Sequence, residues 1–177
     1  MKKSMYTSIN SDKLPRAHKI LDNRTVRALT GGIQVGFSTI IDHGCGRYIE
    51  HVQKHAEDLG YIYIGYDKYW SEEIKNVKTY KEAQQALISL GASAKPLHIS
   101  SNVMNVITDD AELEEYCIGI YDMMCRQEYL ILTVYEAEKP SETQRAEPLN
   151  LYVEKLESYY GFITKRQTKG YAVLLKP

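Results

Sequence analysis

The sequence predicts a doubly wound α/β domain with a mainly parallel sheet and an antiparallel hairpin at its C-terminal edge. Short apolar, β-branched runs alternate with segments of helical spacing, which is the pattern of βαβ units. The last two strand-like runs are separated by only a few residues, which indicates a hairpin. Since the chain has 177 residues, we expect a single domain over 24–177, preceded by a flexible polar arm over 1–23.

The first βαβ unit is predicted to follow a glycine-rich stretch. Residues 37–42 are apolar and β-branched, which predicts a buried strand. Apolar residues keep helical spacing over 47–59, and residues 61–67 predict a second strand parallel to the first. A short segment whose apolar residues have helical spacing begins near Val26. Another helix is expected over 80–90, and no strand is expected between 67 and 80.

The second half of the chain continues the alternation. The expected elements are a strand over 95–101, a helix over 109–126, a strand over 129–135, a helix over 149–160 and a hairpin formed by 162–167 and 171–175. Acidic residues at 109, 110 and 112 favour a helix start there, and Gly161 favours a helix end. The sheet would therefore be parallel except at its C-terminal edge.

Composition narrows the classes of function. The net charge is −1, from 22 Lys+Arg and 23 Asp+Glu, so no long-range attraction to a polyanion is expected. Three cysteines match no zinc or disulfide framework, no metal site is expected, and no run is long and apolar enough to span a bilayer. These features predict a cytoplasmic protein without a membrane partner.

The turn after the first predicted strand contains two closely spaced glycines. Gly44 and Gly46 allow the backbone to approach a ligand at the carboxyl end of the sheet. Asp67 ends the second predicted strand, where a carboxylate can accept hydrogen bonds from both hydroxyls of a ribose. A dinucleotide site prefers a third glycine where this chain has Ile49, and Asp42 adds negative charge that opposes a pyrophosphate. The pattern favours an adenosine ligand without phosphates.

These residues resemble a known family. Residues 40–46, Ile-Ile-Asp-His-Gly-Cys-Gly, resemble motif I of the class I S-adenosylmethionine-dependent methyltransferases, a Rossmann-like fold. Residues 101–107, Ser-Asn-Val-Met-Asn-Val-Ile, resemble the Ser-Asn-Val-Leu-Asn-Val-Ile signature of a small subgroup common in bacteriophages and their hosts. In that subgroup a basic residue and a tyrosine follow the glycine motif, as at Arg47-Tyr48, and Asp67-Lys68-Tyr69 is similar to its Asp-Pro-Tyr.

The resemblance implies a cofactor, S-adenosyl-L-methionine, with S-adenosyl-L-homocysteine as product, and roles for individual residues. The glycines would pass under the methionine part, Asp42 would hold the motif or the amino group, Asp67 would bind the ribose, and the segment from Asn102 would lie beside the sulfonium. The implied cofactor-binding residues are Asp42, Gly44, Cys45, Gly46, Tyr48, Asp67, Lys68, Tyr69, Asn102 and Val103.

The methyl acceptor and the catalytic residues stay open at the level of sequence. Methyl transfer is an in-line displacement that needs a base only if the acceptor holds a proton, so the candidates Asn102, Asn105, Tyr135 and Glu136 have no assigned roles. Both asparagines have an alternative role as caps of the following helix. The acceptor is a small molecule, a nucleotide, a nucleic acid or a protein side chain, and no oligomeric state is predicted.

Two other functions are compatible with the same residues. The chain is short and has no explicit catalytic motif, which fits a binding or sensing module that holds S-adenosylmethionine without transferring its methyl group. A nucleotide-binding Rossmann domain is the third interpretation, and the absent third glycine argues against it.

Overall fold

The computed structural model describes residues 20–24, 27, 37–47, 49–91, 94–135, 138–142 and 144–177. Most of the expected arm, and the helical spacing around Val26, lie outside these residues. Ile20 and Leu21, at the end of the expected arm, are buried in the core beside α4 (Ile49–Asp58).

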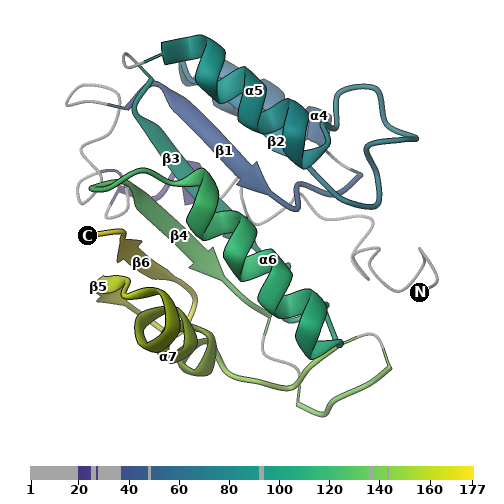
Figure 1. Ribbon diagram of the computed structural model, residues 1–177, viewed down its shortest axis with the longest axis vertical. Coiled ribbons are helices and arrows are strands. Elements are labelled where there is room, and N and C mark those ends of the chain that lie inside the picture. The colour runs from purple at the N-terminus through teal and green to yellow at the C-terminus, as the bar shows by residue number, and fades with distance from the viewer. Residues whose placement is uncertain are drawn as a thin grey trace.

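A six-stranded sheet forms the centre of the domain (Figure 1). Its strands are β1 (Thr39–His43), β2 (Ile62–Tyr66), β3 (Pro96–Ser101), β4 (Tyr129–Thr133), β5 (Ile163–Gln167) and β6 (Ala172–Leu175). The order across the sheet is β2-β1-β3-β4-β6-β5. The first four strands are parallel, and β6 is antiparallel to both β4 and β5. The predicted fold class, a doubly wound sheet with an antiparallel C-terminal hairpin, is confirmed.

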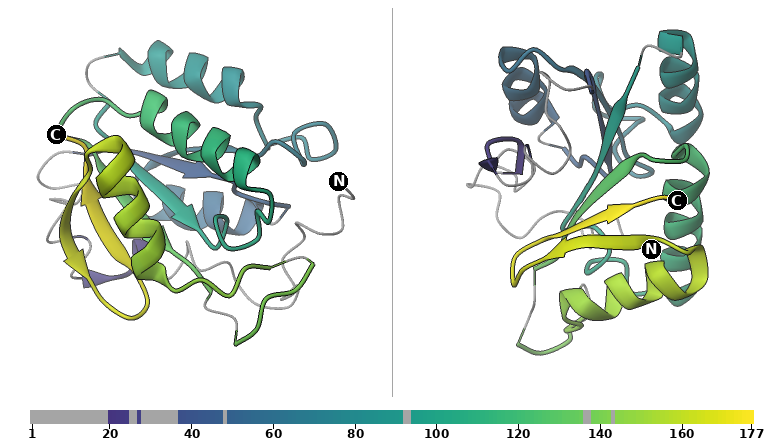
Figure 2. Two further views of the ribbon diagram at one scale, coloured as in Figure 1. Left: turned by 60° about the horizontal axis from the view of Figure 1, so that its bottom comes forward. Right: turned by 90° about the vertical axis from the view of Figure 1, so that its left-hand side faces the viewer.

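Helices cover both faces of the sheet (Figure 2). α4 lies on one face, and α5 (Tyr80–Leu90), α6 (Asp110–Met123) and α7 (Leu149–Tyr160) lie on the other. Two boundary signals explain why the predicted bounds of α5 and α7 match the structure. Thr79 and Glu82 form a capping box at the start of α5, and Gly161 ends α7 in the left-handed conformation.

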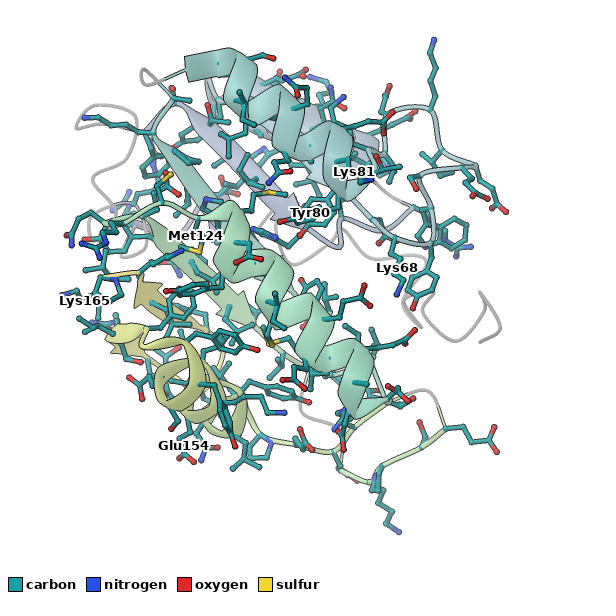
Figure 3. The ribbon with its side chains drawn as sticks, in the orientation of Figure 1. Lys68, Tyr80, Lys81, Met124, Glu154 and Lys165 are labelled. Atoms are coloured by element: carbon teal, nitrogen blue, oxygen red, sulfur yellow. The ribbon has the colours of Figure 1, made fainter. Side chains whose placement is uncertain are left out.

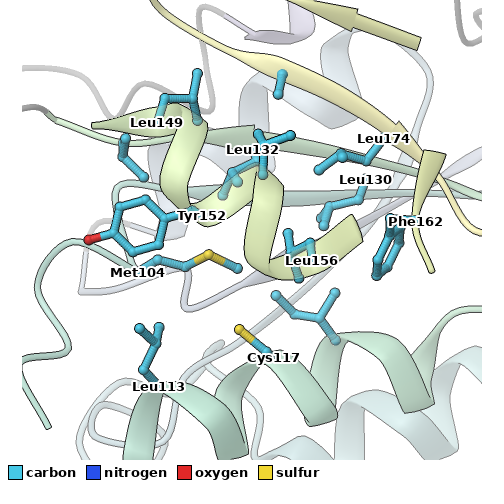
Figure 4. Close-up of a cluster of buried hydrophobic side chains, with 14 of the residues drawn as sticks. Met104, Leu113, Cys117, Leu130, Leu132, Leu149, Tyr152, Leu156, Phe162 and Leu174 are labelled. Atoms are coloured by element: carbon cyan, nitrogen blue, oxygen red, sulfur yellow. The ribbon is translucent and has the colours of Figure 1, made fainter. Parts of the chain in front are cut away.

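Two large apolar clusters hold the layers together. One joins α4 to residues such as Ile40, Leu97 and Ile99 of the central strands. The other packs α6 and α7 against β4 and β6, and Figure 4 shows Leu113 and Cys117 on the side of α6 that faces Tyr152 and Leu156 of α7. Because β1 and β3 are buried on both faces, their carboxyl ends are held firmly in place.

The segment between β2 and β3 contains no further strand in the described residues, as the sequence predicts. An isolated parallel bridge joins Tyr66 to Lys78 before α5 begins. None of the helices in the described part of the chain is long and apolar enough to cross a membrane.

Candidate functional site

A cavity of about 710 Å³ opens at the carboxyl ends of β1, β2 and β3 and extends between α5 and α6. Its described lining consists of Gly44, Cys45, Gly46, Arg47, Tyr66, Asp67, Lys68, Tyr69, Trp70, Ser71, Glu72, Thr79, Tyr80, Ser101, Asn102, Val103, Val106, Ile107, Glu112, Glu115, Tyr116, Ile118, Gly119 and Asp122. This edge is where doubly wound sheets bind ligands, and the volume is in the range of small-molecule sites.

The glycine turn is bonded to the end of β2. Gly44 and Gly46 have φ of 70° and 67°, the left-handed region that glycine adopts without strain. The N–H groups of Gly44 and Cys45 donate to the carbonyl oxygen of Tyr66 at 2.9 and 3.1 Å, and the N–H of Gly46 donates to Oδ2 of Asp67 at 3.1 Å. Three successive N–H groups of this turn are therefore used within the protein, whereas a phosphate-binding turn directs such groups at the ligand.

The turn also packs directly against the segment after β3. A Cβ atom at Gly44 would lie 2.8 Å from one methyl carbon of Val103 and 2.9 Å from the other. A Cβ atom at Gly46 would meet nothing within 4 Å. Residues 40–46 and 101–107, the two stretches that carry the family resemblance, thus meet at Gly44 and Val103. We call this contact the cavity floor.

Asp67 lies directly after β2 and is 9% exposed. Besides the bond from Gly46, its Oδ1 accepts the N–H groups of Tyr69 at 2.8 Å and Trp70 at 3.3 Å. The carboxylate is thereby fixed at the cavity wall between the glycine turn and the loop that follows β2. A carboxylate held in this way is positioned for a ligand hydroxyl that enters the cavity.

The loop after β2 reaches across to α6, and Figure 3 shows Lys68 on that side of the cavity and Tyr80 between α5 and α6. Lys68 Nζ lies 3.1 Å from Glu115 and 3.8 Å from Glu112, and the Tyr69 hydroxyl donates to Glu112 at 3.2 Å. The hydrogen bond to Glu115 raises the pKa of Lys68. Lys68 and Tyr69, both predicted to bind cofactor, line the cavity while their polar ends contact α6.

Carboxylates outnumber cations around the cavity. Its described lining includes the acidic residues Asp67, Glu72, Glu112, Glu115 and Asp122, and the cationic residues Arg47 and Lys68. Lys68 is already paired with acidic residues of α6. The resulting field favours a ligand that carries positive charge. Five aromatic residues, Tyr66, Tyr69, Trp70, Tyr80 and Tyr116, supply flat apolar surface beside these charges.

Asn102 adopts a conformation that is unusual for a residue other than glycine. Its φ is 59°, and its N–H donates to the carbonyl oxygen of Thr133 at 2.8 Å. Its Oδ1 is buried without a hydrogen-bond partner among the described residues, although the residue lines the cavity. A left-handed backbone at a residue other than glycine and an unpaired buried oxygen are both features that occur often at functional sites.

The capping alternative for the two asparagines is wrong. The N-cap of α6 is Asp109, whose side chain accepts the N–H of Glu112 at 2.9 Å. Asn105 is buried, does not line the cavity, and its Oδ1 also has no partner among the described residues.

Several predicted site residues do not line this cavity. Asp42 is buried on the α4 side of the sheet, where the Tyr63 hydroxyl donates to its Oδ2 at 2.6 Å, and burial raises its pKa to about 7. Tyr135 follows β4 and is 51% exposed. Tyr48 and Glu136 lie outside the residues that the structure describes.

Cys45 and the histidines that the structure describes show no metal-binding or nucleophilic arrangement. Cys45 lines the cavity, but burial raises the pKa of its thiol well above the ordinary value. Among the residues that can be described, no three His, Cys, Asp or Glu side chains group as metal ligands. Sequence reasoning missed Tyr66, Tyr80 and Tyr116, which reach the cavity because β2, α5 and α6 converge there.

Comparison with solved structures shows which known fold the domain has. No family model matches the sequence, and no curated protein matches it. Among solved structures, the chain is similar to the 1,6-didemethyltoxoflavin-N1-methyltransferase of Burkholderia thailandensis, whose crystal structure holds 1,6-didemethyltoxoflavin and S-adenosylhomocysteine. The similarity covers 90% of this chain and 75% of that chain, with a TM-score of 0.54 and 14% sequence identity. The fold is that of a class I methyltransferase. At this identity the match concerns the fold alone.

Proposed function

We propose that the chain binds S-adenosyl-L-methionine in this cavity and transfers the methyl group to an acceptor, leaving S-adenosyl-L-homocysteine. The observation that carries the proposal is the cavity floor, in which the glycine turn is bonded to Asp67 and packed on Val103. Asp67 would accept the ribose hydroxyls, the turn from Gly44 to Gly46 would pass under the methionine part, and Asn102 would lie beside the sulfonium. The solved relative of the same fold supports this assignment, because its crystal structure holds S-adenosylhomocysteine.

The electrostatics of the cavity favours a sulfonium over a pyrophosphate. The turn's N–H groups already donate to Tyr66 and Asp67, so they are not directed at a phosphate. The excess of carboxylates around the cavity attracts a cationic ligand and repels a dinucleotide. The same observations argue against the interpretation as a nucleotide-binding Rossmann domain.

The part of the cavity between α5 and α6 would hold the acceptor. Tyr80 and Tyr116 line it from the two helices, and Asn102 lines the cavity directly after β3. We propose a small-molecule acceptor, because the solved relative holds one beside S-adenosylhomocysteine. Held in line with the sulfonium methyl, such an acceptor would need mainly positioning for the displacement.

Substitution of Asp67 tests the ribose site. We expect Asp67→Ala to weaken S-adenosylhomocysteine binding about 10- to 100-fold, since charge-assisted hydrogen bonds to the ribose are lost. Asp67→Asn keeps one acceptor oxygen and should lose less. Isothermal titration calorimetry of both variants measures the change.

Asp58→Ala is the matched control, because Asp58 is an exposed carboxylate at the end of α4 that pairs with Lys54. It should leave the affinity unchanged. Unchanged affinity in Asp67→Ala, in a variant that unfolds at the wild-type midpoint, would contradict the ribose assignment.

A further inference from the structure

Four side chains form a continuous hydrogen-bonded chain from the cavity to the opposite end of the sheet. Tyr66 lines the cavity, and its hydroxyl oxygen lies 2.6 Å from Nδ1 of His43. Nε2 of His43 lies 2.8 Å from Nδ1 of His98, and Nε2 of His98 lies 3.0 Å from Oε2 of Glu128. Both histidines are 0% exposed, and the Glu128 side chain is 16% exposed.

The carboxylate fixes the direction of every bond in this chain. Oε2 of Glu128 also accepts the N–H of Cys125 at 2.7 Å, so it acts as an acceptor. His98 must then donate from Nε2 and accept at Nδ1, which makes Nε2 of His43 the next donor. Nδ1 of His43 is left to accept the hydroxyl proton of Tyr66. All donors thus point away from the cavity and toward Glu128.

Both imidazole rings are held neutral. Burial lowers the pKa of His43 well below its ordinary value, and His98 lowers it further. Burial also lowers the pKa of His98, with Lys176 acting in the same direction and the hydrogen bond to Glu128 opposing it. A neutral imidazole that accepts at one nitrogen and donates at the other can pass a proton without becoming a stable cation.

The position of these histidines argues against a purely structural role. They occupy β1 and β3, the central strands, where their neighbours Ile41 and Ile99 are apolar and fully buried. Apolar side chains of similar volume would fill such positions without the desolvation cost of polar groups. Their hydrogen bonds connect the cavity-lining Tyr66 with Glu128, a carboxylate at the opposite end of the sheet.

We propose that this hydrogen-bonded row of four side chains is a proton path. We also propose that the methyl acceptor is a nucleophile that still carries its proton, such as a hydroxyl, thiol or N–H group. The inference rests on the proposed methyl transfer. As the nucleophile attacks the methyl carbon, the new bond forms and the S–C bond breaks, leaving its electron pair on sulfur. The nucleophile becomes strongly acidic in this step, and its proton passes to the oxygen of Tyr66.

The remaining shifts balance the step. The hydroxyl proton of Tyr66 moves to Nδ1 of His43, the Nε2 proton of His43 moves to Nδ1 of His98, and the Nε2 proton of His98 moves to Glu128. Both rings stay neutral, while the positive charge of the sulfonium and the negative charge of Glu128 disappear together. After product leaves, the shifts reverse and Tyr66 releases the proton to water in the open cavity.

The first test is independent of any cofactor. Nitrogen-15 chemical shifts of His43 and His98 at pH 7 report which ring nitrogen carries the proton. We expect both rings to be neutral and protonated at Nε2. Protonation at Nδ1 in either ring, or an imidazolium at His98 paired with Glu128, would reverse the direction of the donors and overturn the proposal.

The second test distinguishes a proton path from a purely structural role. It compares two methyl acceptors, phenol and pyridine, with methyl-labelled S-adenosylmethionine as the donor. Phenol carries a proton on its nucleophilic atom and pyridine does not. We expect wild type to methylate phenol, and Glu128→Gln to slow this reaction at least tenfold. The variant keeps an oxygen that accepts from His98 and Cys125, so its unfolding midpoint should match wild type.

Tyr66→Phe, which removes the first hydroxyl of the hydrogen-bonded chain, should give the same selective loss. Transfer to pyridine but not phenol in wild type, or an equal loss with both probes in Glu128→Gln, would overturn the proposal. Failure of the proposed function has a different signature: the tautomers are as expected, and the wild-type protein binds no adenosyl ligand.

Discussion

Gly44→Ala is expected to lower the free energy of unfolding by about 3 kcal/mol and to abolish measurable cofactor binding. Two costs combine at this position. An L-residue at φ of 70° costs roughly 1–2 kcal/mol, and a Cβ atom 2.8 Å from a methyl carbon of Val103 adds an overpacking cost on the order of 1–3 kcal/mol. Relief of the clash would separate the turn from the segment after β3, which opens the cavity floor. Urea unfolding and calorimetric titration measure the two effects.

Gly46→Ala is the matched control for backbone strain. Its φ of 67° is nearly the same, but its Cβ atom would meet nothing within 4 Å, so we expect a loss of only about 1 kcal/mol. Adding Val103→Ala to Gly44→Ala should restore part of the lost stability, because the clashing methyl groups are gone. Equal losses in the two glycine variants would contradict the account of the cavity floor.

Asp42→Asn is expected to remove much of the dependence of stability on pH between about 4 and 7. Burial, reinforced by Asp67, raises the pKa of Asp42 from its ordinary 3.8 to about 7, while the hydrogen bond from Tyr63 acts in the opposite direction. The folded protein therefore keeps this proton over a range in which the unfolded chain has lost it. Since the folded state binds more protons, stability falls as the pH rises through this range, by as much as about 4 kcal/mol.

The variant carries no titratable group at position 42 and its amide oxygen can still accept from Tyr63. We expect it to match wild type near pH 4 and to be more stable at pH 8. Denaturant unfolding at a series of pH values measures the difference, with Asp58→Asn as the exposed control, for which no such change is expected. A variant that loses stability with pH as steeply as wild type would show that Asp42 is ionised at low pH in the folded state.

Much of the fold follows from local sequence. The alternation of apolar runs and helical spacing predicts the order of the elements described, and Gly161 marks a helix end that the structure confirms. Gly44, Gly46 and Asp67 are predicted to meet because the carboxyl ends of parallel strands share one edge, and the family resemblance implies that Asn102 joins them. The structure places all four around one cavity.

The rest of the site depends on packing that the sequence does not encode locally. Tyr66, His43 and His98 are far apart in the chain and meet only through the register of β1, β2 and β3. Asp42 and His43 are adjacent in sequence, yet alternation along a strand sends one toward α4 and the other toward the face of α5 and α6. Their different surroundings become visible only once the faces are known.

Calorimetric titration of the wild-type protein with S-adenosylmethionine, S-adenosylhomocysteine and NAD tests the central claim most directly. The cavity floor and the excess of carboxylates predict micromolar binding of both adenosyl ligands, competition between them for one site, and no binding of NAD. Binding of NAD, or displacement of an adenosyl ligand by it, would contradict the assignment of this cavity to a sulfonium cofactor.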